Sequence, residues 1–174
     1  DWSAVDASIF GTLFERGMDP AKRSQLGAHY TSRDDITTLV EPVVMQPLRR
    51  EWAEVRAKVE MLLGAAASVP DAVVSPKAAG TAATTPNKKS RAAAEKQFQQ
   101  FLLRLQSVRV LDPACGSGNF LYVTLQKLLD LEKEVNNHAR DLGFTPHFPQ
   151  VNPQQLHGIE INLYAHDLAQ MTCW

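Results

Sequence analysis

A glycine-rich turn between two apolar runs constrains the fold of this 174-residue chain more than any other feature. The turn, Asp112-Pro113-Ala114-Cys115-Gly116-Ser117-Gly118-Asn119-Phe120, follows the run 108–111 and leads into the run 120–123. This order predicts a strand, a tight turn and a helix. Gly116 and Gly118 can adopt positive φ and leave room for a ligand, and the first N–H groups of a helix favour negative charge. We therefore expect the turn to hold a small ligand, with a nucleotide cofactor as the first candidate.

The residues of the turn narrow the choice of cofactor. A dinucleotide fingerprint requires a third glycine where this chain has Leu121, and no G-x-x-x-x-G-K-[ST] string occurs. Asp112 places a carboxylate where a pyrophosphate would be repelled and an ammonium group would be attracted. S-adenosylmethionine carries an amino-acid end and an adenosine end, so it is the favoured cofactor.

A second acid is expected at the same edge of the fold. Residues 156–161 predict a second strand, which follows a long helix over 119–138 and a proline-containing loop over 139–155. Strands joined in this way are parallel, and ligands bind outside their carboxyl ends. We expect Glu160 to accept hydrogen bonds from a ribose diol and Ile161 to pack on adenine. Glu160 follows Asp112 by 48 residues, against about 20 in the dinucleotide fingerprint, and the long helix and loop account for the excess.

Three segments together resemble the DNA adenine-N6 methyltransferases of restriction–modification systems. The turn 112–120 resembles the cofactor loop of that family, Leu26-Gly27-Ala28-His29-Tyr30-Thr31-Ser32 its N-terminal cofactor motif, and Gly158-Ile159-Glu160-Ile161-Asn162 its acidic motif. The segments 9–16 and 41–44 are similar to large single-chain enzymes that fuse a nuclease to such a methyltransferase. The resemblance covers most of residues 5–63 and 105–174.

The resemblance implies an α/β fold: an incomplete, Rossmann-like class I methyltransferase with parallel strands, preceded by an N-terminal helical segment. It implies S-adenosylmethionine as cofactor and transfer of a methyl group to N6 of adenine in DNA. It places Tyr30 and Thr31 at the methionine end of the cofactor, and we expect Asn119 and Phe120 to shape the pocket wall. The full set of expected cofactor contacts is Tyr30, Thr31, Asp112, Pro113, Ala114, Gly116, Gly118, Asn119, Phe120, Glu160 and Ile161.

The chemistry of base recognition is expected to lie outside this chain. The catalytic motif of the family is Asn/Asp-Pro-Pro-aromatic, and Asn152-Pro153-Gln154-Gln155 lacks its second proline and its aromatic residue. We therefore predict no catalytic residue here, little or no methylation by the chain alone, and DNA contacts made mostly by the rest of a parent polypeptide. The net charge of −1 agrees with this expectation, because the chain has no excess of positive charge with which to bind nucleic acid. Cys115 is expected to be a small residue filling the turn rather than a nucleophile, Cys173 a core residue, and no metal site is predicted.

The remaining sequence predicts three parts: a helical segment with the cofactor arm at 1–63, a flexible low-complexity insertion at 64–90, and the first strand–helix–strand unit at 91–174. Helices are expected at 5–17, 36–44 with a kink or break near Pro42 and Pro47, 48–63, 91–106, 119–138 and 163–174. Two cysteines and the lack of a signal peptide or membrane-length apolar run indicate a cytoplasmic protein. We read the chain as a piece of a longer protein. A two-stranded parallel sheet leaves an exposed edge, so self-association is also expected.

The residues alone are also compatible with two other functions. One is a non-catalytic module that binds an adenosine-containing ligand and serves assembly or regulation. The other is a nicotinamide-dependent oxidoreductase, which Leu121 at the third glycine position disfavours.

Overall fold

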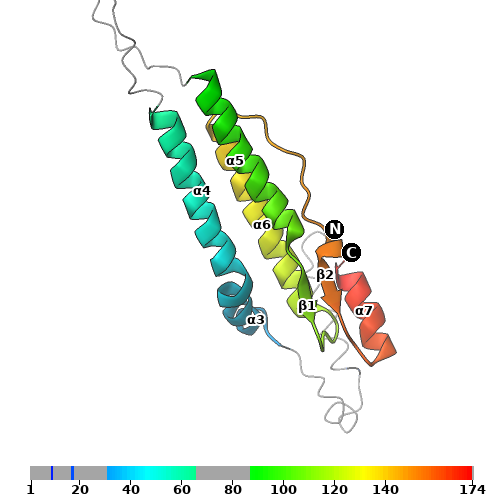
Figure 1. Cartoon of the computed structure of the whole chain (residues 1–174). Helices are drawn as coiled ribbons and strands as arrows, with labels where there is room; N and C mark the ends of the chain where they lie inside the picture. The colour runs from blue at the N-terminus through cyan, green and yellow to red at the C-terminus, as the bar shows by residue number, and fades with distance from the viewer. Residues whose placement is uncertain (1–8, 10–16, 18–30, 66–86, 174) are drawn as a thin grey trace, which may run out of the picture.

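The computed structural model describes Ile9, Gly17, residues 31–65 and residues 87–173. Its elements run in the order α3 (Arg33–Val40), η1 (Glu41–Met45), α4 (Gln46–Ala65), α5 (Lys88–Ser107), β1 (Val110–Asp112), α6 (Asn119–Asp141), η2 (Pro153–Gln155), β2 (Leu156–Gly158) and α7 (Leu163–Cys173) (Figure 1). The helix predicted at 5–17 and the arm up to Tyr30 lie outside the described residues, apart from Ile9 and Gly17.

Three long helices, α4, α5 and α6, lie side by side and form the main core (Figure 1). The apolar faces predicted for α4 and α5 are confirmed: Trp52, Phe98 and Leu105 are buried. Trp52 stacks on Phe101 with ring centroids 5.3 Å apart. Its indole N–H donates to Oε1 of Glu134 at 2.9 Å, which ties α4 to α6. The buried apolar residues of α6 complete this core: Val123, Leu125, Leu128, Leu131, Val135 and Ala139. Leu121 packs instead in a smaller cluster with Cys115 and Ala169.

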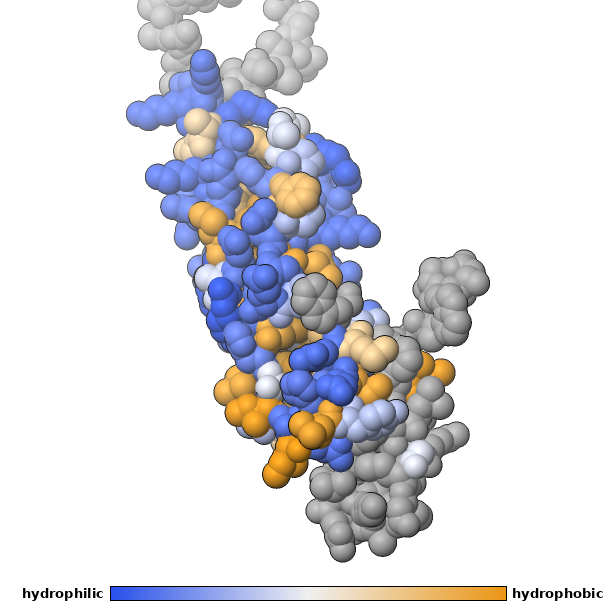
Figure 2. All heavy atoms as spheres, turned by 90° about the vertical axis from the view of Figure 1, so that its right-hand side faces the viewer, coloured by the Kyte–Doolittle hydropathy of each residue, from blue (hydrophilic) through white to orange (hydrophobic). Residues whose placement is uncertain are grey.

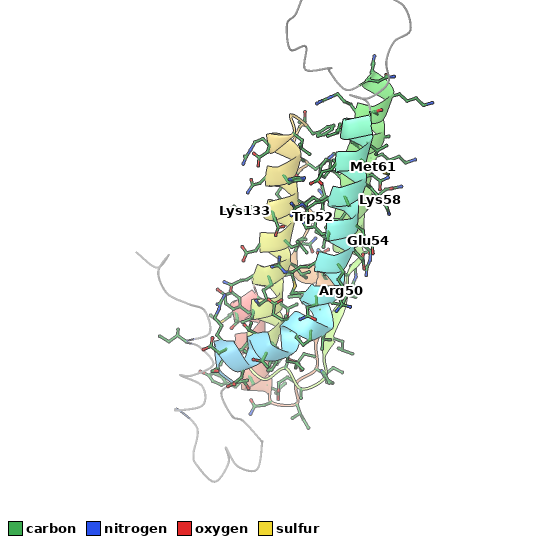
Figure 3. The ribbon with its side chains drawn as sticks, turned by 90° about the vertical axis from the view of Figure 1, so that its left-hand side faces the viewer. Arg50, Trp52, Glu54, Lys58, Met61 and Lys133 are labelled. Atoms are coloured by element: carbon green, nitrogen blue, oxygen red, sulfur yellow. The ribbon has the colours of Figure 1, made fainter. Side chains whose placement is uncertain are left out.

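The outer side of α4 is charged, as expected for a surface helix with one buried stripe. In Figure 3, Trp52 lies between α4 and α6, whereas Arg50, Glu54 and Lys58 lie on the side of α4 that faces the viewer. Within the part of the chain that the structure describes, no helix is long and apolar enough to span a lipid bilayer.

The first helical segment bends but does not break. Ser32 caps α3 by accepting the N–H of Asp35 at 3.2 Å. A π-helical turn, η1, then carries the chain into α4, and the helix axis changes direction there (Figure 3). Pro42 lies within this π turn and Pro47 in the first turn of α4. Proline has no N–H and its ring clashes with the preceding turn, and both prolines and π turns are known causes of helix bending.

The two strands are parallel, as predicted, with Val110 opposite Leu156 and Asp112 opposite Gly158. The α/β arrangement of an N-terminal helical region and parallel strands is therefore confirmed. Each strand is shorter than predicted: the sequence indicated 108–112 and 156–161. The first strand starts late because the N–H of Val108 still bonds to the carbonyl of Leu105 at the end of α5.

Two buried polar side chains hold β2 against the helices. Glu132 on α6 is 2% exposed, and its Oε1 accepts the N–H groups of Gln150 and Val151 at 2.6 and 3.2 Å. Gln155, also 2% exposed, donates to the carbonyl oxygen of Leu105 at 2.8 Å. These bonds fix the segment that precedes β2, and they set the position from which β2 enters the sheet.

Several helix ends differ from the prediction for local reasons. α5 begins at Lys88 rather than Arg91, because Asn87 caps it by accepting the N–H of Lys89. α6 continues to Asp141 rather than His138 and ends where Gly143 adopts a φ of 75°. The predicted loop at 139–155 therefore contains the end of α6 and the short helix η2. Residues 66–86 of the predicted insertion lie outside the described part.

Large apolar side chains are exposed around the carboxyl ends of the strands. Leu111, Ile161 and Leu163 are 60%, 91% and 81% exposed. In Figure 2 the apolar surface gathers toward this end of the molecule, and hydrophilic groups dominate the opposite end. The strand end therefore differs in character from the helical end, which agrees with a site or an interface at the strand end.

Adjacent leucines on α6 offer a matched test of the core. Leu128 is fully buried and Leu129 is 39% exposed. We expect Leu128→Ala to lower the free energy of unfolding by about 2–5 kcal/mol, because it leaves a cavity between the helices. Leu129→Ala should change it by less than about 1 kcal/mol. Urea unfolding followed by circular dichroism measures both, and equal effects would contradict the packing described.

Candidate functional site

The glycine-rich turn leaves β1 as a compact loop held by its own backbone. Oδ1 of Asp112 accepts the N–H of Ala114 at 3.0 Å, and the N–H of Gly118 bonds to the carbonyl of Cys115 at 2.8 Å. Gly116 and Gly118 have φ values of 53° and 84°, which confirms the positive φ expected for both. α6 then begins without a side-chain cap. Its first N–H groups are therefore available to a ligand with negative charge.

The second acid lies beside this loop, as the parallel topology predicted. Oε2 of Glu160 accepts the N–H of Gly116 at 2.9 Å, and Oε1 accepts the N–H of Asn162 at 2.7 Å. Two backbone bonds join the same segments, from Ile159 N–H to the Asp112 carbonyl and from Cys115 N–H to the Ile159 carbonyl. Glu160 thus follows β2 rather than ending it. A carboxylate has about four lone-pair sites, so roughly two stay available to a ligand.

The two glycines of the loop have different surroundings. Among the residues that the structure describes, none has an atom within 4 Å of the position a Cβ on Gly116 would take, so they leave that side of the loop open. A Cβ on Gly118 would lie 3.0 Å from Cα of Ala169, because α7 packs against it. The room predicted beside Gly118 is therefore filled by α7, whereas Gly116 has the space expected for close approach of a ligand. A cofactor contact through the backbone of Gly118 stays a prediction.

An apolar hollow of about 270 Å³ adjoins the loop on the side of α3 and η1. It includes Asp112, Pro113, Ala114 and Phe120 from the predicted contacts. No site role was predicted for Leu39, Val40, Val43 and Val44, which form the facing wall. The helical spacing of apolar residues over 36–44 predicts a buried face. Leu39 and Val43 are instead 54% and 65% exposed, so this part of the wall is open to solvent.

The other predicted contacts have distinct settings. Asn119 is 7% exposed, and its Oδ1 has no hydrogen-bond partner among the described residues. Ile161 is 91% exposed and free to cover a ligand surface. Thr31 is half-buried at the start of the described chain, next to the Ser32 cap. Tyr30 lies outside the described residues, so its predicted role stays a prediction.

The cysteines lack the setting of a nucleophile. Burial raises the pKa of Cys115 above its ordinary value of 9.0, and the carboxylates of Asp112 and Glu160 raise that pKa further. Burial also raises the pKa of Cys173 to about 11. Both thiols are therefore protonated near neutral pH. Cys115 packs on β2 instead: a Cβ on Gly158 would lie 2.6 Å from its Sγ. Within residues 31–65 and 87–173 no cluster of His, Cys, Asp and Glu suits a metal ion.

The crowding at Gly118 yields a testable difference between the two glycines. We expect Gly116→Ala to cost about 1 kcal/mol of unfolding free energy, from positive φ alone. Gly118→Ala should cost about 2–4 kcal/mol, because it adds a clash with α7. Ala169→Gly removes the Cβ that would lie 3.1 Å from the new methyl group, so the double variant should lose less stability than the sum of the two single losses. Urea unfolding of the four proteins measures this, and strictly additive losses would contradict the contact.

The raised thiol pKa values predict slow alkylation and an alkaline loss of stability. We expect Cys115 and Cys173 to react with iodoacetamide more slowly in the folded chain than in urea, at pH 7.5, since less thiolate is present. The folded state holds these protons longer than the unfolded state. Their contribution to stability is therefore complete below pH 9 and is lost as the pH rises toward about 11. Urea unfolding across this range measures the loss, and Cys173→Ala should reduce it.

Comparisons with known proteins agree with this geometry. The family model described as the DNA-methyltransferase domain of MmeI matches residues 87–174. DNA methyltransferase A of Bacillus subtilis (strain 168) is 26% identical over 175 residues, which span 100% of this chain and 16% of that protein. The putative type II restriction enzyme and methyltransferase RM.MjaORFECS2P of Methanocaldococcus jannaschii is also 26% identical over 175 residues, which span 98% of this chain and 14% of that protein.

A solved structure also matches the whole chain. The Type IIL restriction-modification enzyme MmeI, in complex with DNA, superposes with a TM-score of 0.70 at 30% sequence identity. The match covers 100% of this chain and 19% of the MmeI chain. This chain therefore spans less than a fifth of the length of the relatives it matches. The matched family model covers half of the residues, including the loop, Glu160 and α7, so the chain belongs to the family of MmeI-type DNA-methyltransferase domains.

Proposed function

We propose that this chain is the S-adenosylmethionine-binding part of a longer restriction–modification enzyme that methylates N6 of adenine in DNA. The observation that carries the proposal is the meeting of the Asp112 loop and the Glu160 carboxylate at one edge of a parallel sheet. Ligands of open parallel sheets bind outside the carboxyl ends of the strands. The family membership supports methyl transfer to DNA.

The residues at this edge fit the chemistry of the proposed cofactor. Asp112 offers a carboxylate to an ammonium group, and the uncapped start of α6 offers N–H groups to a carboxylate. Gly116 leaves open space beside the loop. Oδ1 of Asn119, which has no partner in the described part of the chain, is a buried acceptor that a donor group of the cofactor would satisfy. Glu160 keeps lone pairs for a ribose diol, and Ile161 exposes an apolar face for adenine.

The chain's own contribution to the reaction is positioning. When bound, S-adenosylmethionine supplies an electrophilic methyl group on its sulfonium. Asp112 and the start of α6 would hold the amino-acid end of the cofactor, and Glu160 with Ile161 its nucleoside end. In-line transfer depends mainly on such orientation. We also propose that β1 and β2 belong to a Rossmann-like class I sheet completed by the rest of the polypeptide, which would present the base. Self-association through the sheet edge stays a prediction for the isolated chain.

Calorimetric titration tests this proposal. It compares S-adenosylmethionine with NAD as ligands, and it compares two Asp→Asn variants with the wild-type chain. We expect S-adenosylmethionine to bind the chain and NAD not to bind. Asp112→Asn should lower the affinity for S-adenosylmethionine by about tenfold. The amide oxygen of asparagine can still accept the Ala114 N–H, but the side chain no longer carries a negative charge. Asp130→Asn changes an exposed aspartate on α6 and should leave affinity unchanged.

Tritiated-methyl transfer to DNA is measured on the same samples, and we expect none, since the chain holds no Asn/Asp-Pro-Pro-aromatic motif. Tight binding of NAD with no binding of S-adenosylmethionine would overturn the proposal. If Asp112→Asn and wild type bind S-adenosylmethionine with equal affinity, Asp112 does not hold the ammonium group of the cofactor.

A further inference from the structure

We propose that Glu160 is a positioning residue for the cofactor loop, in addition to the ligand role suggested by its place after β2. Its carboxylate staples the loop to the start of α7 before any cofactor arrives. This inference rests on the proposed function in so far as the loop binds S-adenosylmethionine, but the staple itself is a property of the chain without ligand.

The staple consists of one carboxylate and two backbone N–H groups from different segments. Oε2 accepts from Gly116, which lies 44 residues earlier in the chain, at 2.9 Å. Oε1 accepts from Asn162 at 2.7 Å. Hydrogen bonds to a charged acceptor are roughly twice as strong as neutral ones. Each oxygen of Glu160 therefore fixes a different segment of the site.

Gly116 is the residue at which such a restraint matters most. It has positive φ, and no atom of the described residues lies within 4 Å of the position a Cβ would take, so their side chains do not confine it on that side. A glycine in open surroundings loses much conformational freedom when it is ordered. The bond to Glu160 supplies the restraint that packing does not supply there.

The other end of the staple connects the loop to α7. Asn162, which donates to Glu160, also caps α7: its Oδ1 accepts the N–H groups of Tyr164 and Ala165 at 3.0 and 3.1 Å. Further along α7, Ala169 packs on Gly118. α7 therefore supports the loop at both of its glycines, at Gly116 through Glu160 and at Gly118 through direct packing.

The staple and the ligand role are compatible because they use different lone pairs. Two of the roughly four lone-pair sites of the carboxylate are taken by backbone N–H groups. The remaining ones can receive a diol. Glu160 is half-buried, so it is reachable from solvent. The carboxylate is then already oriented before binding, which reduces the entropic cost of ordering the site.

The first experiment follows amide hydrogen exchange by NMR in the full chain without ligand, comparing wild type with Glu160→Gln. An amide oxygen can accept one N–H, but the NH₂ group of glutamine cannot accept the other. We expect exchange at Gly116 or Asn162 to quicken by about tenfold or more. Glu132→Gln is the matched control, because Glu132 also accepts two loop N–H groups but contacts neither Gly116 nor Asn162. It should leave exchange at Gly116 and Asn162 unchanged. Because Oε1 of Glu132 accepts both loop N–H groups, any change should be confined to Gln150 and Val151.

The second experiment separates positioning from direct contact with the diol. S-adenosylhomocysteine and its 2′,3′-dideoxy analogue, which has no ribose diol, are titrated into wild type and Glu160→Gln. A pure ligand role predicts that the variant binds the dideoxy analogue as well as wild type does. The staple predicts that the variant binds both compounds more weakly, with at least a threefold loss for the dideoxy analogue.

Unchanged exchange at both Gly116 and Asn162 in Glu160→Gln would overturn the staple. Equal binding of the dideoxy analogue to both proteins would overturn the positioning role. If neither compound binds wild type, the proposed cofactor is wrong, and the exchange experiment alone decides whether the staple exists.

Discussion

The parallel pairing of β1 with β2 is the constraint on which the site depends. It places Asp112 opposite Gly158, so that the chain leaves both strands at the same edge. The loop after β1 and the segment after β2 then meet, and the Glu160 carboxylate reaches the Gly116 N–H at 2.9 Å. Neither segment contains enough regular structure to fix itself, since each strand has three residues. The site is therefore as rigid as the elements that hold these two short strands in register.

Those elements are helices, and they act through polar as well as apolar contacts. The buried Glu132 and Gln155 secure the approach to β2 from α6 and from the end of α5. A part-buried ion pair between Lys127 and Glu41, at 2.6 Å, joins α6 to η1. α6 is common to most of these contacts, and its first turn is also the wall of the candidate site. Packing in the helical layer thus positions the N–H groups at the start of α6, so the core and the site share one rigid element.

The sequence predicted the parts of the site that follow from chain order. Strand, turn, helix and strand imply parallel strands, and parallel strands imply that Asp112 and Glu160 share an edge. Positive φ at Gly116 and Gly118 followed from the absence of a Cβ. The contact of Ala169 with Gly118 could not be predicted, because it depends on how α7 packs. The bond from Gly116 to Glu160 could not be predicted either, because chain order brings the two segments together without fixing the direction of the side chain. The wall formed by Leu39 and Val43 was also missed, since apolar spacing along a helix predicts a buried face, whereas these two side chains are 54% and 65% exposed.

The two glycines show why a sequence motif alone is an incomplete guide to a binding loop. Both have positive φ and both belong to the same motif, yet one faces open space and the other faces a helix. A substitution at Gly118 reports on the packing of α7 before it reports on any ligand. A substitution at Gly116 tests the loop surface itself, but that glycine is also held by Glu160. Loss of binding in either variant therefore has a structural component, and it identifies a ligand contact only after the stability of the loop has been measured separately.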